Sequence, residues 1–216
     1  RHINMTKLHT SLLACTLLLV GCGGEPEESA APEPEVTETD SETSLKLYIF
    51  DCGRLGVDSP VGFSIQDDET DVRELVTPCY IVDHPDGRLL WDAGLPSSLA
   101  GIEGGDGNQR LDRTLADQLA ELDLGFDLSS LDYVAFSHMH FDHVGAANDV
   151  SGATWLVQQV EHEAMFADPV SVPATQPDLY ENLRDAEHIL LNGDHDVFGD
   201  GRVRILSAPG HTPGHQ

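Results

Sequence analysis

The sequence predicts a mixed α+β domain in which strands and helices alternate along the chain and pack in layers. Three observations carry this prediction. Residues 45–51 alternate apolar and polar side chains, as a half-buried strand does. Two apolar runs flank the turn residues 84–87, which is typical of a β-hairpin. Leucines recur at helical spacing over residues 111–122, which indicates an amphipathic helix lying on a sheet.

The first segment, residues 1–22, combines four upstream residues, 1–4, with a pattern from Met5 onward that is typical of a secretory signal. Lys7 precedes the apolar run 12–20, which is too short to span a bilayer as a folded helix. Residues 19–22 (LVGC) resemble a bacterial lipobox, and this resemblance implies cleavage before Cys22 and lipidation of its thiol. A plain signal peptide with an incidental cysteine is the alternative. We therefore expect a bacterial cell-envelope protein, at the periplasmic face or the outer membrane, that contacts membrane only through this lipid anchor.

The second segment, residues 23–44, is acidic, contains three prolines and has no aromatic residue. Such a segment cannot bury enough apolar surface to offset the entropy lost on ordering. We expect a disordered, self-repelling linker. The remaining residues, 45–216, form the predicted domain.

Within this domain, the hairpin joins predicted strands at residues 76–83 and 88–92 through the turn His84-Pro85-Asp86-Gly87. Shorter apolar runs predict further strands at 132–137, 154–157, 188–191 and 202–207. The leucine-rich helix is expected to end at Gly125, and a second helix is expected over about 158–166. Glycines and prolines indicate loops or turns at 101–107, 168–178 and 193–201.

The charge of the chain excludes two classes of function. There are 38 acidic residues against 11 Lys and Arg, a formal net charge of -27. A nucleic-acid binder needs a basic surface that neutralises phosphates, and a membrane-surface helix needs a basic face. The sequence predicts neither, and a small molecule is the expected partner.

The predicted domain contains two cysteines, Cys52 and Cys79. An oxidising compartment would permit a disulfide between them. Each lies in an apolar, strand-like context, so we expect two buried thiols instead. The chain has no CxxC pair of the kind found in zinc ribbons.

A run of metal-ligating side chains follows the predicted strand that ends at Ser137. The run contains His138, His140, Asp142 and His143. In an extended loop, residues i and i+2 project to the same side, so the first two histidines can bind one ion. A turn can then direct Asp142 and His143 to a second ion. Imidazole and carboxylate groups suit zinc and neighbouring divalent metals, and surface histidines without a ligand are rarely massed in this way.

A second group, residues 208–215 (APGHTPGH), follows the last predicted strand. His211 would lie in a tight turn at a strand end, at the same level as the first motif. It is a natural third nitrogen ligand for the first ion. His215 is expected on the first turn of a helix, where its ring would bond to backbone rather than to metal.

Together these motifs resemble the metallo-β-lactamase superfamily. The resemblance implies an αββα sandwich with a one- or two-metal site at one edge. Residues 47–55 (LYIFDCGRL), 78–96 (PCYIVDHPDGRLLWDAGLP), 138–145 (HMHFDHVG) and 207–216 (SAPGHTPGHQ) are similar to the N-acyl-homoserine lactonase branch, which includes quorum-quenching enzymes. The resemblance extends over residues 45–216.

Carried over residue by residue, the resemblance implies two divalent metal ions, expected to be zinc. His138, His140 and His211 would bind the first ion, and Asp142 and His143 the second. Asp92 matches a strand-end Asp of the superfamily. We expect it to support the metal-binding loop rather than bind metal. A turn carboxylate at the end of a strand is the alternative.

The family pattern also includes a bridging Asp, a Tyr and a last His, and the sequence through Gln216 offers no match for them. We therefore expect the chain to be a C-terminally truncated fragment that holds an incomplete sandwich. An exposed half-sandwich is expected to aggregate.

The resemblance implies a hydrolase that opens the lactone ring of N-acyl-homoserine lactones through attack of a metal-bound hydroxide. Two ions about 3.5–4 Å apart would lower the pKa of a shared water. Asp142 would act as the general acid that protonates the leaving ring oxygen.

Two other functions remain open at this stage. The same site could belong to a hydrolase of another lactone or ester, a β-lactam, a thioester or a phosphodiester, although the acidic surface disfavours the RNA-cleaving branch. The fragment could also be a non-catalytic metal-binding lipoprotein.

Overall fold

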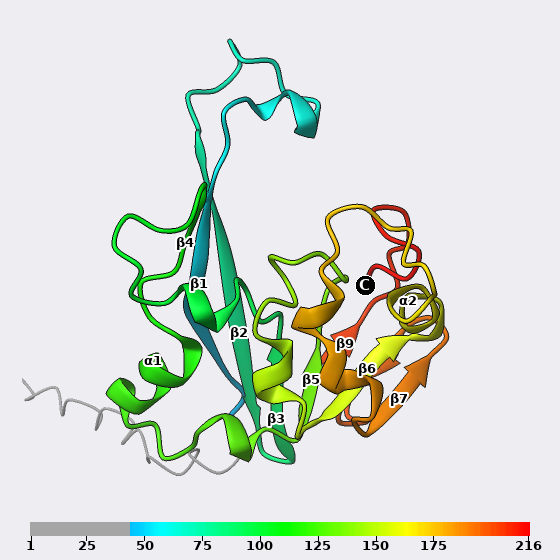
Figure 1. The fold of residues 1–216 in the computed structure, drawn as a ribbon. Coiled ribbons are helices and arrows are strands. Elements are labelled where there is room, and N and C mark those ends of the chain that lie inside the picture. Colours follow the sequence, from blue (N-terminus) through cyan, green and yellow to red (C-terminus); the bar gives the residue numbers. More distant parts are fainter. Residues whose placement is uncertain (1–43) are drawn as a thin grey trace, which may run out of the picture. The chain divides into compact units, whose positions relative to one another are not determined.

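The computed structural model describes residues 44–216 (Figure 1). The predicted signal segment, the lipidation of Cys22 and almost all of the predicted linker lie outside the described residues and remain predictions. Within residues 44–216, no helix is both long and apolar enough to span a membrane.

The described residues form a mixed sheet of seven strands and a separate two-stranded sheet. The strand order of the large sheet is β4-β1-β2-β3-β5-β6-β7, and β8 pairs with β9. The strands are β1 (Lys46–Gly56), β2 (Glu74–His84), β3 (Gly87–Trp91), β4 (Gln109–Arg110), β5 (Tyr133–Ala135), β6 (Thr154–Gln158), β7 (His188–Leu191), β8 (His195–Asp196) and β9 (Arg204–Ile205).

Helices are few and short. The two α-helices are α1 (Leu115–Leu122) and α2 (Gln159–Met165). Short 3-10 helices occur at Pro60–Phe63, Ser97–Leu99, Leu128–Ser130, Ala147–Val150, Pro177–Leu179 and Glu181–Arg184. This mixture of a large sheet with few helices confirms the predicted α+β class.

The large sheet combines two kinds of pairing. β1, β2 and β3 pair antiparallel, and the predicted hairpin is present, with Asp83 opposite Arg88 beside the turn. β3, β5, β6 and β7 pair parallel. The loops that follow the parallel strands therefore emerge at one edge of the sheet, as the ends of parallel strands do.

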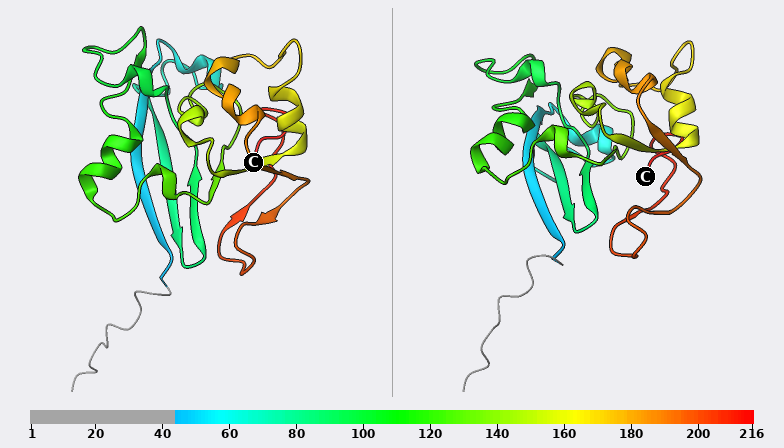
Figure 2. Two further views of the ribbon diagram at one scale, coloured as in Figure 1. Left: turned by 60° about the horizontal axis from the view of Figure 1, so that its bottom comes forward. Right: turned by 90° about the horizontal axis from the view of Figure 1, so that it is seen from below.

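Two hydrophobic layers cover opposite faces of the parallel strands, because successive strand residues point to opposite faces. On one face, Leu90 of β3 packs in a large core with Leu119 of α1 and Trp155 of β6. On the other, the neighbouring Leu89 packs in a smaller core with Val197 and Ile205 from the β8–β9 region. Figure 2 shows β8 and β9 on the side of the sheet away from α1.

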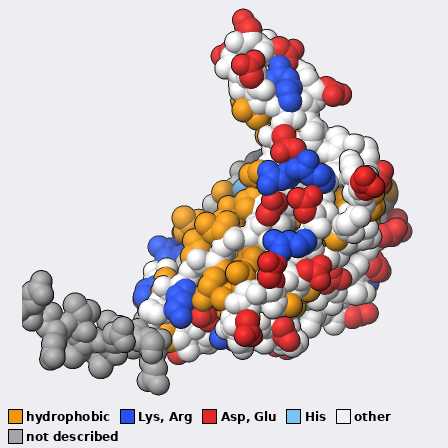
Figure 3. Space-filling view, turned by 90° about the vertical axis from the view of Figure 1, so that its left-hand side faces the viewer, with side chains coloured by type: hydrophobic (Ala, Val, Ile, Leu, Met, Phe, Trp, Pro, Cys, Tyr) orange, Lys and Arg blue, Asp and Glu red, His pale blue; other side chains and the backbone are white. Residues whose placement is uncertain are grey.

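The face of β1 and β2 turned away from the large core is uncovered among the described residues. Leu47 and Ile49 of β1 are 59% and 65% exposed. Figure 3 shows hydrophobic side chains gathered on the side of the molecule that carries β1. An apolar strand face of this kind is a liability for association with other chains.

The predicted leucine-rich helix is shorter than its periodicity suggested. α1 begins at Leu115 because Thr114 caps it. The Thr114 hydroxyl accepts a hydrogen bond from Asp117 N, and the Asp117 carboxylate accepts one from Thr114 N. The helix ends at Leu122 and is capped by Asp123, which adopts the left-handed conformation two residues before the predicted Gly125. Leu111 instead precedes the helix in a small core with Leu55 and Leu95.

The prediction of two free thiols is wrong. Cys52 and Cys79 form a disulfide between β1 and β2, with 5.7 Å between their Cα atoms, although both are buried as expected. The ladder of β1 and β2 shifts register between Asp51 and Arg54, and Cys52 lies in this irregularity beside its partner. The sequence could not place the two cysteines opposite each other because they are 27 residues apart.

Two predicted segments near the C-terminal side differ in detail. The region 193–201, expected to be only a turn, contains β8. The strand expected over 202–207 is reduced to β9, because only Arg204 and Ile205 pair with β8.

Candidate metal centre

The predicted metal-binding residues come from loops at one edge of the parallel sheet. Asp92 directly follows β3, and residues 137–143 follow β5. His211 lies in a segment without helix or strand that follows β9. Because these loops emerge together, residues far apart in the sequence meet at one place.

The structure brings together the three histidines that were assigned to the first ion. One ring nitrogen from each of His138, His140 and His211 lies within 4.8 Å of the others. The ring centroids of His138 and His211 are 4.6 Å apart, and those of His140 and His211 are 4.7 Å apart. Three convergent imidazoles form the donor set that zinc and similar divalent ions take in catalytic sites.

Asp142 and His143, assigned to the second ion, lie beside this trio. His143 Nε2 is 3.6 Å from Asp142 Oδ2, and the His143 and His138 rings are 4.1 Å apart. All five side chains line one pocket of about 450 Å³. The donor set therefore suits one ion at the trio and leaves a carboxylate and an imidazole for a second ion.

The protonation of the trio also suits metal binding. Burial lowers the pKa of His138 to about 2, and the neighbouring histidines add to this effect. Burial and the nearby His211 also lower the pKa of His140. Both rings are neutral near pH 7, and a neutral imidazole is the form that binds a metal ion.

Asp92 makes hydrogen bonds to the loop of residues 137–143. Its Oδ1 accepts from Ser137 N at 2.7 Å, and its Oδ2 lies 2.9 Å from His143 Nδ1. Burial opposes charging of the His143 ring, but the hydrogen bond and charge of Asp92, with the charge of Asp142, outweigh burial and raise the pKa of His143. Asp92 thus contacts both Ser137 of the loop and the ring of a predicted ligand, and its role as a supporting carboxylate stays a prediction.

His215 differs from its prediction. Residues 211–216 form turns rather than the first turn of a helix. The His215 ring makes no hydrogen bond to backbone among the described residues, and its Nδ1 is buried without a partner there. Instead the ring lies 5.0 Å from that of His138. After the first histidine loop, the chain forms a 3-10 helix at Ala147–Val150.

The sequence did not single out three residues that organise the site. Ser137 lies between Asp92 and the histidines, with its hydroxyl 3.1 Å from His138 Nδ1. Glu161 and Thr212 are buried and hydrogen-bonded to each other. The sequence held one signal for Glu161, an acidic residue on the apolar face of a helix. It lies four residues before Met165, which is buried.

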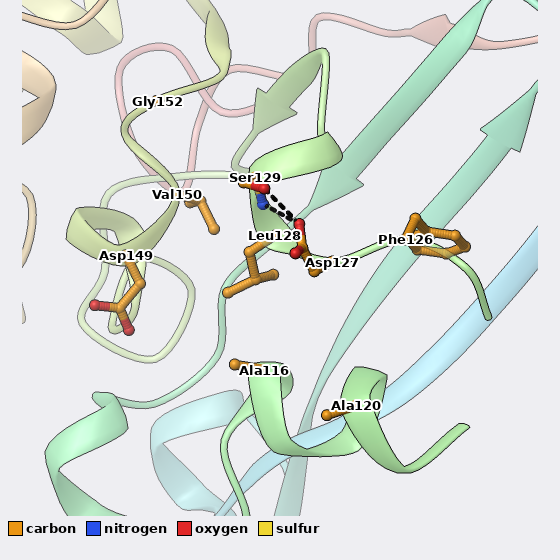
Figure 4. Close-up of a pocket in the computed structure, with 9 residues that line it drawn as sticks. All are labelled: Ala116, Ala120, Phe126, Asp127, Leu128, Ser129, Asp149, Val150 and Gly152. Atoms are coloured by element: carbon orange, nitrogen blue, oxygen red, sulfur yellow. Dashed lines mark hydrogen bonds between the residues drawn. The ribbon is translucent and has the colours of Figure 1, made fainter. Parts of the chain in front are cut away.

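A second cavity, of about 530 Å³, lies between α1 and the segments around residues 126–129 and 149–152 (Figure 4). Its walls contain no histidine. The Asp127 carboxylate already accepts from Ser129 N and Oγ, and that of Asp149 from Ser97 Oγ. This cavity gathers no convergent reactive groups, so the histidine pocket is the candidate active site.

Known proteins match both the sequence and the fold. Residues 72–216 match the profile of the Metallo-beta-lactamase superfamily. The chain is 29% identical over 184 residues to an N-acyl homoserine lactonase from Bacillus sp., which covers 81% of this chain and 69% of the relative. It is 30% identical over 187 residues to the N-acyl homoserine lactonase AttM from Rhizobium johnstonii, covering 81% and 70%.

Solved structures give the same picture. A quorum-quenching N-acyl homoserine lactone hydrolase superposes with a TM-score of 0.63 at 26% identity and covers 80% of this chain and 67% of its own. Another N-acyl homoserine lactone hydrolase, solved with the product N-hexanoyl-L-homoserine at its catalytic metal centre, has a TM-score of 0.61 at 28% identity, covering 80% and 69%.

Proposed function

Because the chain belongs to the metallo-β-lactamase superfamily, we propose that it is a metal-dependent hydrolase that opens the ring of N-acyl-homoserine lactones. The observation that carries the proposal is the pocket in which three histidines converge beside Asp142 and His143. The similarity to N-acyl homoserine lactonases over 81% of the chain supports this substrate class.

The chain's own residues divide the work of such a reaction. His138, His140 and His211 would hold one divalent ion, with Asp142 and His143 available to a second. When bound, such ions supply a Lewis acid for the carbonyl and lower the pKa of water. Asp92 and Ser137 would orient His143 and His138 through the hydrogen bonds behind them.

Asp142 is the residue suited to move the proton. Its carboxylate lines the pocket and has a histidine within 3.6 Å. Opening a lactone with water forms a C–O bond between the water oxygen and the carbonyl carbon and breaks the ring C–O bond. The attacking water gives up a proton, and the alkoxide left on the ring oxygen needs one. A carboxyl group at the site can carry that proton to the leaving oxygen as a general acid.

The walls of the pocket suit an acyl chain. Besides Thr77, Asp142 and the histidines, the pocket is lined by four apolar residues, Leu55, Phe63, Leu75 and Val76. Burying the methylene groups of an acyl tail against them contributes about 0.8 kcal/mol per CH₂. A polar reacting end at the histidines and an apolar tail against this wall match the two ends of an N-acyl-homoserine lactone.

The test is ring opening by the full chain. The protein is loaded with zinc, incubated with N-hexanoyl-homoserine lactone at a pH where spontaneous opening is slow, and the open product is measured by mass spectrometry. We expect turnover that chelation abolishes and added zinc restores. A β-lactam and a glutathione thioester serve as comparison substrates.

Two results would overturn the proposal. Turnover of the β-lactam or thioester without lactone opening would assign the site to another hydrolase of the superfamily. Zinc bound with no turnover of any substrate would indicate a non-catalytic metal-binding protein.

A further inference from the structure

We propose that Glu161 is a positioning residue that couples the two histidine loops and sets the place of His211 in the metal centre. The inference rests on the proposed metal site and goes beyond it, because Glu161 is not a ligand and does not line the histidine pocket. Its carboxylate joins the loop that carries His138 and His140 to the loop that carries His211.

The contacts of Glu161 define this role. The residue lies in the first turn of α2 and is 3% exposed. Its Oε1 accepts from Met139 N at 2.9 Å and from Thr212 Oγ1 at 2.8 Å. Its Oε2 accepts from Gly214 N at 2.7 Å. One carboxylate thus holds both loops at hydrogen-bond distance.

The partners of Glu161 are neighbours of the predicted ligands. Met139 lies between His138 and His140, and Thr212 directly follows His211. A displacement of the carboxylate therefore moves the backbone on both sides of the histidine trio. Since imidazole nitrogens must meet one ion at about 2.0–2.1 Å, small displacements of one ligand weaken binding.

The loop that carries His211 has few other anchors. Residues 206–216 contain no helix or strand. At its far end, Gln216 donates from its backbone to Ser137 O and from its side chain to Phe136 O. His211 is five residues from Gln216. The two loop residues that Glu161 contacts are closer to His211: Thr212 is one residue away and Gly214 is three. Glu161 is therefore the anchor that acts nearest to His211.

The chain approaches α2 closely at Gly214. A Cβ atom at this position would lie 2.6 Å from the Cβ and from the backbone N of Glu161. Glycine lets the loop reach the carboxylate, and a side chain there would push the loop away. The short distance from Gly214 N to Oε2 depends on this approach.

The chemistry of the contacts requires a carboxylate. All three partners of Glu161 are donors, and an ionised carboxylate only accepts, whereas an amide places two N–H donors on one of its end atoms. A buried carboxylate is costly unless it is hydrogen-bonded, so the three donors are held to it. Glu161→Gln keeps the size of the side chain but replaces one accepting oxygen with an NH₂ group, which then faces a donor without an acceptor.

The experiment compares Glu161→Gln, Thr212→Val and the control Gln118→Met in the full chain. Gln118 is likewise a buried polar residue on a helix, and it donates to the carbonyls of Asp51, Arg113 and Thr114, away from the histidines. Zinc affinity is measured by competition with a chromophoric chelator, and the absorption spectrum of the cobalt(II)-substituted protein reports ligand geometry. Thermal unfolding of the metal-free proteins measures stability.

We expect Glu161→Gln to weaken zinc binding about 10–100-fold, as for residues that orient metal ligands, and to change the cobalt spectrum. Thr212→Val, which removes one of the three bonds, is expected to cause a smaller loss. Gln118→Met is expected to lower the unfolding temperature without changing zinc affinity or the spectrum. In a His211→Ala background, Glu161→Gln is expected to cost less affinity than it costs in the wild type, since the part of its effect that acts through His211 is then absent.

Unchanged zinc affinity and an unchanged cobalt spectrum in Glu161→Gln would overturn the inference and leave Glu161 a stabilising residue only. If Glu161→Gln does not fold, unchanged affinity in Thr212→Val overturns it equally. Failure of the wild-type chain to open lactones leaves these zinc measurements intact, so the proposed function and this inference fail separately. A wild-type chain that binds no zinc overturns both.

Discussion

The two loops that supply the histidine trio are held in place by different means. Residues 137–143 follow a parallel strand between β3 and β6, and Asp92 bonds to this loop from the end of β3. His138 is 5% exposed. Residues 207–216 contain no strand or helix, His211 is exposed, and the nearest anchor is Glu161. The sheet and Asp92 position the first loop, whereas the second loop is held by Glu161 of α2 and, at its end, by Gln216.

The two loops of one metal centre can therefore differ in rigidity. The loop built on the sheet inherits its geometry from several ladder hydrogen bonds and a buried core. The other loop depends on a few side-chain contacts, so single substitutions should displace it more easily.

The largest expected effect comes from removing one ligand on either side. His140→Ala and His211→Ala should each lower lactone opening about a thousandfold or more, because losing the Lewis acid costs several kcal/mol of transition-state stabilisation. Measured kcat/KM for the zinc-loaded variants checks this. Near wild-type turnover in either variant would remove that loop from the site.

Removing the disulfide tests whether the stability of the fold and the zinc affinity of the metal centre depend on different contacts. It ties β1 to β2, and neither cysteine lines the histidine pocket. The double variant Cys52→Ala/Cys79→Ala should lose about 2–4 kcal/mol of unfolding free energy and keep its zinc affinity. Urea unfolding and chelator competition measure the two. A loss of zinc affinity would mean that the β1–β2 ladder also positions the histidines.

Gly214→Ala tests the weaker support of the second loop. The added Cβ would press on Glu161, and overpacking of this kind costs about 1–3 kcal/mol. We also expect zinc affinity to fall, because the loop that carries His211 must shift. Gly152→Ala is the matched control, since a Cβ there meets nothing within 4 Å. Equal zinc affinities in the two variants would contradict the comparison of the loops.

The smallest effect concerns the far end of α2. The buried Tyr180 donates from its hydroxyl to Met165 O. Tyr180→Phe should cost about 0.5–1.5 kcal/mol at neutral pH and leave zinc affinity unchanged, because α2 holds Glu161 at its opposite end.

Alkaline pH sharpens the same measurement. Burial raises the pKa of Tyr180 to about 12. An unfolded tyrosine ionises near pH 10, so this contribution to stability is complete below about pH 10 and is lost as the pH rises towards 12. Wild-type protein should therefore lose more stability than Tyr180→Phe over this range. Parallel pH profiles of the two proteins would show that Tyr180 ionises freely in the fold.

Local patterns predicted much of the fold. The hairpin of β2 and β3, the strand at β7 and the helix at α2 follow from apolar periodicity and turn residues within short windows. Where prediction missed, a contact with a distant segment decided the outcome. β9 is short because only two of its residues meet β8, and α1 begins late because Thr114 caps it.

Residue types and their spacing along the chain predicted which side chains form the candidate site. His138, His140, Asp142 and His143 follow one strand within six residues, and chain connectivity alone keeps such residues close. The same reasoning identified His211, since a loop after a later strand reaches the same sheet edge.

The contacts that hold these residues in place come from segments that are distant in the sequence. The bonds from Met139 N and Gly214 N to Glu161 span 22 and 53 residues, and the one from Ser137 N to Asp92 spans 45. The Cys52–Cys79 disulfide was likewise decided by the register of two strands. Periodicity and spacing describe residues that share one element, whereas these contacts exist because separate elements pack against each other.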